Sequence, residues 1–167
     1  TAMALILDGA NFLGGNAERS VRDGASLARR AGCTTVSDIA LFAAGGDFDT
    51  YRTVANADGF PVRVVYSPVI NHMQQVFGAE GLLAHVQQLR AQNTARFAVG
   101  PLKWIADGSI QGYTGKLQWP GYCSGHDHGF LILDEDQVVE QLLPFHRAGF
   151  QAAVHTNGDE ATNVVIN

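Results

Sequence analysis

Cysteine and lysine are both scarce in this chain. Two cysteines, Cys33 and Cys123, are too few for a disulfide framework, so we expect both thiols to be reduced and Cys33 to lie in the core. Lysine also occurs only twice, at Lys103 and Lys116. The net charge of -5, with no basic stripe, gives no electrostatic reason to expect nucleic acid or an anionic membrane surface as a partner.

Long hydrophobic runs are missing as well. The apolar stretches at 5–13 and 130–136 are far shorter than the roughly 18 residues needed to span a bilayer. The first twelve residues have no basic leader before a long apolar stretch, so they do not indicate a secretory signal. We therefore expect a cytoplasmic protein, unless a signal lies upstream of this stretch. A composition of 46% hydrophobic and 16% charged residues is typical of one soluble globular unit, here residues 1–167.

Helical and strand patterns alternate along the chain. Apolar spacing closed by glycine predicts helices, and short β-branched runs predict strands. This alternation is typical of right-handed crossovers that feed a parallel sheet. We predict helices at 20–31, 47–57 and 80–92, from Asp134, and after Asp159; we predict strands at 34–40, 61–67, 102–106 and 151–155.

The helix that begins at Asp134 carries two local signals. Asp134 with Gln137 three positions later has the spacing of a capping box. Pro144 should bend this helix or make its last turn irregular.

Parallel α/β folds collect polar residues at the carboxyl ends of their strands. Lys103 is conspicuous, because it stands in an apolar run where an ammonium is costly to bury. Alternation along the strands puts Lys103 and His155 on the faces opposite the bulkier apolar residues, so both should point inward. The other polar residues expected at this rim are Asp38, Ser67, Asn71, His72, Asp107, Ser109, Asn157 and Asp159.

Three segments together resemble the amidohydrolase superfamily, and within it the YtcJ-like metal-dependent hydrolases. They are GCTTVSDIA (32–40), PLKWIADGSIQGYTGKLQWPGY (101–122) and AGFQAAVHTNGDEA (148–161). The resemblance implies a TIM-type (β/α)8 barrel, of which this chain would form about half, strands two to five. It also implies one or two divalent metals, usually zinc, and hydrolysis of a carbon-nitrogen bond in a small amide-like substrate.

The resemblance also implies roles for individual residues. Lys103 matches a strand-four lysine that is often carboxylated and bridges two metals, and His155 matches a strand-five histidine ligand. The chemistry is consistent, because burial lowers a lysine pKa and an unprotonated amine can form a carbamate. The remaining ligands of the family would lie outside these residues. The residues expected to contact substrate are Asp107, Ser109, Tyr113 and Asp159.

Structural explanations stay open for each of these residues. Lys103 could extend to the rim or pair with Asp107, and His155 could be a hydrogen-bonded structural group. The segment 107–109 could be only a turn, and Asp159 only a helix cap. The segment 126–128, His-Asp-His, could substitute for a missing metal-ligand pair but fits a substrate-side loop better.

Two functional hypotheses of different classes follow. One is a metal-dependent hydrolase with Lys103 and His155 as ligands; the other is a non-catalytic α/β fragment or binding module with an incomplete metal site. Since two ligands cannot close a tetrahedral site, we expect little hydrolysis from these 167 residues alone. A half barrel leaves open sheet edges, which predicts a homo-oligomer.

Overall fold

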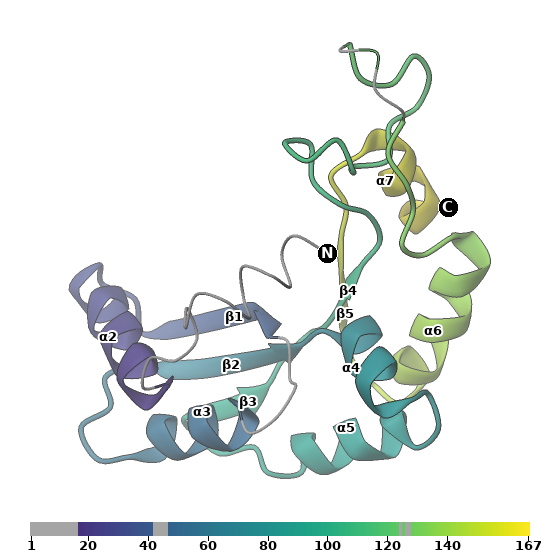
Figure 1. Ribbon diagram of the computed structural model, residues 1–167. Coiled ribbons are helices and arrows are strands. Elements are labelled where there is room, and N and C mark those ends of the chain that lie inside the picture. Colours follow the sequence, from purple (N-terminus) through teal and green to yellow (C-terminus); the bar gives the residue numbers. More distant parts are fainter. Residues whose placement is uncertain (1–16, 42–46, 124, 126–127) are drawn as a thin grey trace.

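The computed structural model describes residues 17–41, 47–123, 125 and 128–167. Short parallel strands run through the molecule, and helices pack beside them (Figure 1). No helix in these ranges is both long and apolar enough to cross a membrane. The helices are α2 (Ala17–Arg30), α3 (Asp47–Asn56), α4 (Ile70–Phe77), α5 (Leu82–Arg90), α6 (Glu135–Arg147) and α7 (Asp159–Ile166); the strands are β1 (Thr35–Leu41), β2 (Arg63–Pro68), β3 (Phe97–Val99), β4 (Leu102–Ile105) and β5 (Ala152–His155).

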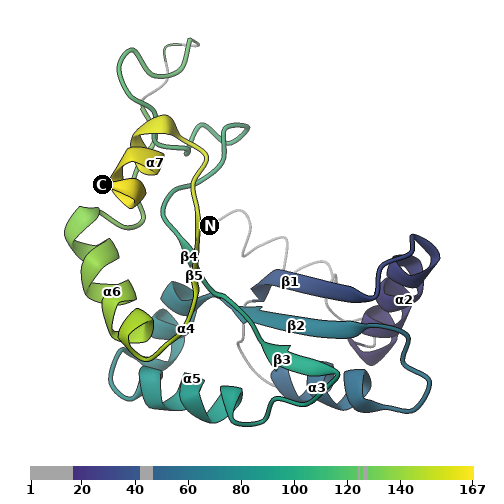
Figure 2. The ribbon, with the colours of Figure 1, turned by 180° about the vertical axis from the view of Figure 1, so that it is seen from behind.

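All described strand pairs are parallel, as the alternating pattern predicts. One sheet has the order β1-β2-β3 and the other pairs β4 with β5. Only Gly100 and Pro101 separate β3 from β4, and Figure 2 shows the two following one another along the same path. A bridge between Val69 and Lys103 links the end of β2 to β4, so the two sheets adjoin. Within the described strands, β1 and β5 each have a single neighbour.

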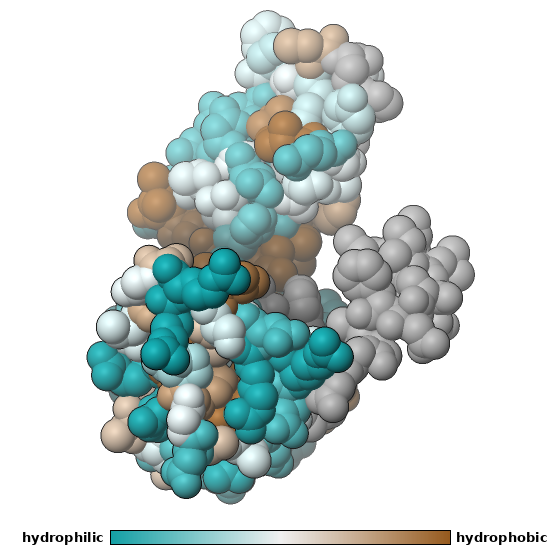
Figure 3. Space-filling model, turned by 90° about the vertical axis from the view of Figure 1, so that its left-hand side faces the viewer, coloured by the Kyte–Doolittle hydropathy of each residue, from teal (hydrophilic) through white to brown (hydrophobic). Residues whose placement is uncertain are grey.

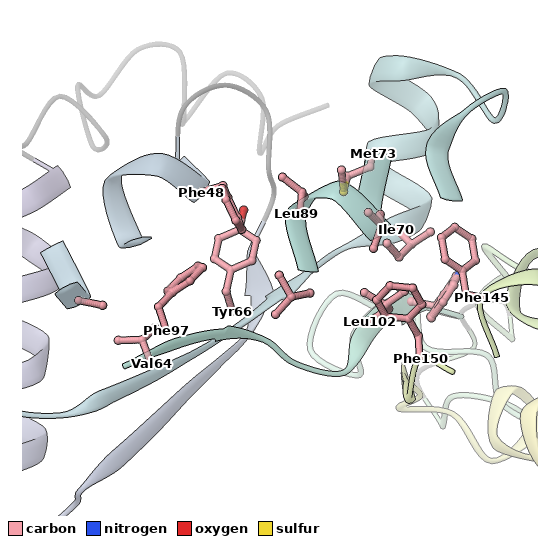
Figure 4. Packing of buried hydrophobic residues seen from close by; sticks show 14 of the residues in the cluster. Phe48, Val64, Tyr66, Ile70, Met73, Leu89, Phe97, Leu102, Phe145 and Phe150 are labelled. Atoms are coloured by element: carbon pink, nitrogen blue, oxygen red, sulfur yellow. The ribbon is translucent and has the colours of Figure 1, made fainter. Parts of the chain in front are cut away.

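The helices cover one face of this sheet and create the core. Phe48 of α3 makes edge-on contacts with Tyr66 of β2, at 5.4 Å, and with Phe97 of β3, at 5.2 Å. Further along, Trp104 of β4 meets Phe145 of α6 at 5.6 Å. Figure 4 shows these two groups joined by aliphatic side chains of the same cluster. The strand residues that alternate with this cluster therefore lie on the opposite face of the sheet, which we call the inner face.

Local signals fixed the ends of several helices. Asp134 accepts a hydrogen bond from the Gln137 backbone N–H at 2.9 Å, and Gln137 Oε1 accepts one from the Asp134 N–H at 3.0 Å. The predicted capping box is thus confirmed. Gly32, with φ 84°, follows α2, where a left-handed residue was expected. Helix α6 continues through Pro144 to Arg147.

The helix α2 has an exposed, charged outer surface. Its side chains form the i,i+4 ion pairs Arg22–Glu18 at 2.9 Å and Arg19–Asp23 at 3.5 Å. Only Ala25 is buried in this helix. Figure 3, which views this side of the molecule, shows a largely hydrophilic surface at its lower end.

Three local predictions were wrong. Cys33 is exposed rather than in the core, because it lies in the turn before β1; both cysteines are free thiols, as expected. Helix α4, which contains His72, was not predicted. The N-cap of α7 is Gly158, and Asp159 is the first residue of the helix rather than its cap.

Candidate metal centre

A one-residue bulge sets the direction of Lys103. Tyr66 of β2 is paired with Val99, and Val69 is paired with Lys103. Val69 is three positions after Tyr66, whereas Lys103 is four positions after Val99. The extra residue at 100–101 reverses the alternation, as β-bulges do, and turns Lys103 to the inner face.

Lys103 is nearly enclosed on that inner face. Lys103 is only 8% exposed. Its neighbours Leu102 and Trp104 are buried in the core on the other side of β4. Among the described residues it has neither an ion pair nor a side-chain hydrogen bond. Burial lowers the pKa of the Lys103 ammonium below its ordinary value of 10.5. Deprotonation of Lys103 to the uncharged amine therefore costs less free energy than deprotonation of an exposed lysine.

His155 shares this face on the adjacent strand. Lys103 is the register partner of Ala153, and His155 is two residues further along β5, so alternation returns it to the same side. Strand spacing and rise then put the α-carbons of Lys103 and His155 about 8 Å apart. Long side chains bridge such a separation, so both nitrogens can reach one common region.

The imidazole of His155 is held by Asn157. The Asn157 Nδ2 lies 2.9 Å from His155 Nε2 and donates to the Gly108 carbonyl at 2.7 Å. The bond to Gly108 identifies this atom as the amide nitrogen, so Nε2 acts as the acceptor. The other ring nitrogen, Nδ1, has no hydrogen bond within the described part of the chain.

Asp107 is completely buried just beyond β4. Its Oδ1 accepts a hydrogen bond from the Asn157 backbone N–H at 2.8 Å. Its Oδ2 accepts two, from the N–H of Lys116 at 2.9 Å and of Gly158 at 2.7 Å. The carboxylate therefore ties the loop after β4 to the loop after β5, and has no surface open to a substrate.

Glycines let these loops pack backbone against backbone. A Cβ on Gly158 would lie 1.7 Å from the Lys116 carbonyl oxygen, and one on Gly129 would lie 2.1 Å from that of Gly115. Real Cβ atoms do not come so close, so only glycine fits. We call residues 107–117, 128–130 and 156–159 the loop cluster.

The other expected substrate contacts also belong to the loop cluster. The Ser109 hydroxyl accepts the Gly112 N–H at 3.1 Å, and Asp159 Oδ1 accepts the Gln118 N–H at 2.9 Å. Tyr113 is 47% exposed, with φ 54°, and its ring meets Tyr122 edge-on at 5.2 Å. Of these three, Tyr113 and Asp159 are exposed and Ser109 is half-buried, and their contact with substrate stays a prediction.

Two further expectations concern residues away from this centre. Asp38 accepts a hydrogen bond from Tyr51 of α3 at 3.1 Å, and its register partner is the core residue Tyr66. It therefore lies on the helix side of the sheet, not on the inner face. Burial, with Asp38 nearby, raises the pKa of Tyr51 to about 12. The residues His126 and Asp127 lie outside the described residues.

A complete metal site is not formed by these residues. Within the described ranges no group of three or more His, Cys, Asp or Glu side chains could hold a metal ion. Lys103 and His155 nevertheless fit part of one, since both place a side-chain nitrogen on the same face of the sheet. A closed site needs further ligands.

Comparison with known proteins identifies the family. The model of the amidohydrolase family matches residues 5–167. The chain belongs to the amidohydrolase family. No curated protein matches this amidohydrolase chain closely enough to count as a relative.

Two solved structures share its fold. One, from Pyrococcus furiosus, is described as an uncharacterized metal-dependent hydrolase; it has 16% sequence identity and a TM-score of 0.69 over 97% of this chain. The other, with the same description, is from Pyrococcus horikoshii OT3 and has 17% identity and a TM-score of 0.70 over 98%. The chain covers 32% of the length of each.

Proposed function

We propose that this chain is part of a metal-dependent hydrolase that cleaves a carbon-nitrogen bond in a small amide-like substrate. Lys103 and His155 are its metal ligands. One observation carries the proposal: a nearly buried lysine without a counter-ion in the described residues shares the inner face with a histidine on the next strand. Membership of the amidohydrolase family supports the same chemistry.

Each ligand has a chemical reason. A divalent metal, when bound, polarises the substrate carbonyl and lowers the pKa of a bound water. Burial makes the amine of Lys103 available to react with carbon dioxide, and the resulting carbamate would be an anionic ligand. The neutral imidazole of His155 would offer its Nε2 lone pair as a nitrogen ligand, in exchange for the hydrogen bond from Asn157. We take the metal to be zinc, as one or two ions, because imidazole nitrogen and an anionic oxygen suit it.

The parallel strands would be strands two to five, about half, of a TIM-type (β/α)8 barrel of the YtcJ-like branch, completed by residues outside this chain. The single neighbours of β1 and β5 support such completion, either by the rest of the protein or by a second copy in a homo-oligomer. The 167 residues alone should then hydrolyse little or nothing.

The test compares ligand variants with matched controls in the protein at its natural length. Lys103→Ala and His155→Ala should each lose tightly bound metal and lower amidase activity by about 100-fold or more. The control variants are Lys116→Ala and His146→Ala, since Lys116 pairs with Glu160 at 3.7 Å and His146 is exposed on α6. Both should retain metal and activity. Metal content is measured by elemental analysis.

A carbamate at Lys103 has its own signature. Wild-type protein supplied with carbon-13-labelled bicarbonate should show a carbamate carbon signal that Lys103→Ala lacks. If the wild type binds no divalent metal, and Lys103→Ala and His155→Ala change nothing, the hydrolase proposal is rejected. The second hypothesis, a non-catalytic module with an incomplete site, would then stand.

A further inference from the structure

We propose that Ile110, Tyr113 and Tyr122 form a substrate subsite beside His155, and that it takes an amide carrying an aromatic ring. This subsite rests on the proposed function, since it names the substrate class of that same site. It adds Ile110 and Tyr122 to the residues expected to contact substrate, and it gives the exposed ring of Tyr113 a ligand.

The loop after β4 lies on the same side of the sheet as the two proposed metal ligands. Helix α6 covers the other side, where Phe145 meets Trp104. Figures 1 and 2 both show the first part of this loop turning away from α6. The loop therefore extends over the side of the inner face, to which Lys103 and His155 belong.

The surroundings of Gly115 connect this loop to His155. A Cβ on Gly115 would lie 3.0 Å from Ile110 Cδ1 and 3.2 Å from Tyr122 Oη. The Cβ of Asn157 lies 3.5 Å from the same point. The three side chains therefore converge above Gly115. Because the Asn157 carboxamide lies 2.9 Å from His155 Nε2, Ile110 and Tyr122 are separated from the proposed ligand by one side chain.

The surface changes from polar to apolar with distance from His155. The imidazole and the Asn157 carboxamide come first, and both can hydrogen-bond to an amide group. Next come Ile110, which is 43% exposed, and the rings of Tyr113 and Tyr122, which meet at 81°. Two rings at this angle offer one face and one edge, the two surfaces that a third aromatic ring packs against. An amide attached to an aromatic ring has the same order of polar and apolar groups.

Tyr113 adopts a backbone conformation that is unusual for a large residue. Its φ of 54° lies in the left-handed region, which glycine would adopt without strain. Its N–H donates to the Ile110 carbonyl at 3.1 Å, and Tyr122 Oη donates to the Gly115 carbonyl at 2.8 Å. A tyrosine in a strained, tightly bonded turn indicates a use for the ring. Since the turn is already fixed, binding a substrate here costs little ordering of the loop.

The experiment compares two pairs of amides, with the protein at its natural length. Phenylacetamide is paired with acetamide, and N-benzylacetamide with N-methylacetamide, so the ring lies on either side of the carbon-nitrogen bond. The wild type should favour the ring-bearing member of at least one pair by about 10- to 100-fold in kcat/KM, because the ring is buried on binding. Tyr113→Gly, which suits the left-handed backbone, and Ile110→Ser should each lower this preference by about 10-fold, through KM for the ring-bearing amide.

Two control variants separate the ring from the fold. Tyr113→Phe keeps the ring and should keep the preference. Phe77→Ala removes another exposed aromatic residue, at the end of α4 on the helix side, and should also keep it. A residue that served only the fold would instead lower the melting temperature and reduce activity towards both members of a pair equally.

The results distinguish this subsite from the proposed function, which the metal content and activity of the Lys103 and His155 variants decide. If the wild type hydrolyses amides without favouring a ring, the subsite is rejected and the hydrolase proposal stands. The same holds if folded Tyr113→Gly and Ile110→Ser keep the wild-type preference. If Tyr113→Gly does not fold, Ile110→Ser decides alone.

If the wild type hydrolyses none of the four amides, binding decides. Saturation-transfer nuclear magnetic resonance should then detect the ring protons of phenylacetamide or N-benzylacetamide on the wild type and on Phe77→Ala, but not on Tyr113→Gly. Absence of binding to the wild type, or equal binding to Tyr113→Gly, would overturn the subsite.

Discussion

Two regions of this molecule are held together by different forces. Around α3, β2 and β3, aromatic rings pack edge to face under the helices. Around the exits of β4 and β5, a carboxylate, backbone N–H groups and glycines hold the loop cluster. Apolar packing is strong but tolerant in direction, whereas hydrogen bonds fix direction. The aromatic region therefore provides stability, and the loop cluster provides the geometry that a site needs.

The largest expected effect comes from the aromatic region. Phe97→Ala removes a fully buried ring that contacts Phe48, and should lower the free energy of unfolding by about 3 to 5 kcal/mol. The folded fraction should still bind metal normally. Urea denaturation and zinc titration measure the two quantities, with Leu27→Ala in α2, 63% exposed, as the control that changes neither. Loss of zinc affinity in folded Phe97→Ala would contradict this division.

The next effect concerns two glycines. Gly158→Ala places a Cβ against the Lys116 carbonyl, and we expect a loss of about 2 to 3 kcal/mol. Gly24→Ala in α2 meets nothing within 4 Å and should instead stabilise the protein by about 0.5 to 1 kcal/mol, since alanine favours helix. Thermal and urea unfolding compare the pair. If both variants changed the free energy of unfolding equally, the loop cluster would have to relax around the new Cβ of Gly158→Ala.

A third prediction uses the pH dependence of stability. Because burial lowers the pKa of Lys103 below 10.5, the unfolded chain binds more protons than the folded one between the two pKa values. Lys103 therefore destabilises the metal-free fold at neutral pH, and this cost fades as the pH rises to 10.5. Lys103→Met should be more stable than wild type at pH 7, and the gain should shrink at higher pH.

The measurement for Lys103→Met is urea denaturation from pH 7 to 10.5 in metal-free buffer without carbon dioxide. Lys116→Met is the control, since this side chain is only partly buried and pairs with Glu160. A gain for Lys103→Met that does not vary with pH would mean that packing, not charge, is its cause.

The smallest effect is expected at Tyr66. Its hydroxyl is buried without a hydrogen-bond partner, so Tyr66→Phe should change the free energy of unfolding by less than about 1 kcal/mol, towards greater stability. Tyr51→Phe loses the bond to Asp38 and should cost about 1 kcal/mol. A large loss for Tyr66→Phe would reveal a polar contact in the aromatic region. Calorimetry resolves differences of this size.

Much of the aromatic region could be predicted from the sequence, because its signals are local. The strand at 61–67 and the helix at 47–57 were expected close to the observed β2 and α3. Helix α4 was missed because its polar sequence, from Asn71 to Gln75, has little apolar periodicity. Only Ile70 and Met73 of that helix enter the core.

Less of the candidate site could be predicted. Lys103 and His155 stood out through residue type and strand alternation, and the register places both on one face. The role of Asp107 could not be predicted, since its partners Asn157 and Gly158 are 50 and 51 residues away. A sequence pattern shows residue types, but not which distant N–H groups a carboxylate will meet.

The bulge at 100–101 makes the number of residues before Lys103 as important as their identity. Deleting one residue there would exchange the two sides of β4, so that the amine would enter the aromatic layer and the Trp104 indole would face the opposite way. Substitution of Pro101 should therefore be tolerated better than its deletion, whereas Gly100 has no room for a Cβ beside Val65. In an evolutionary comparison, insertions and deletions at this point would separate proteins that keep the inward amine from those that have lost it.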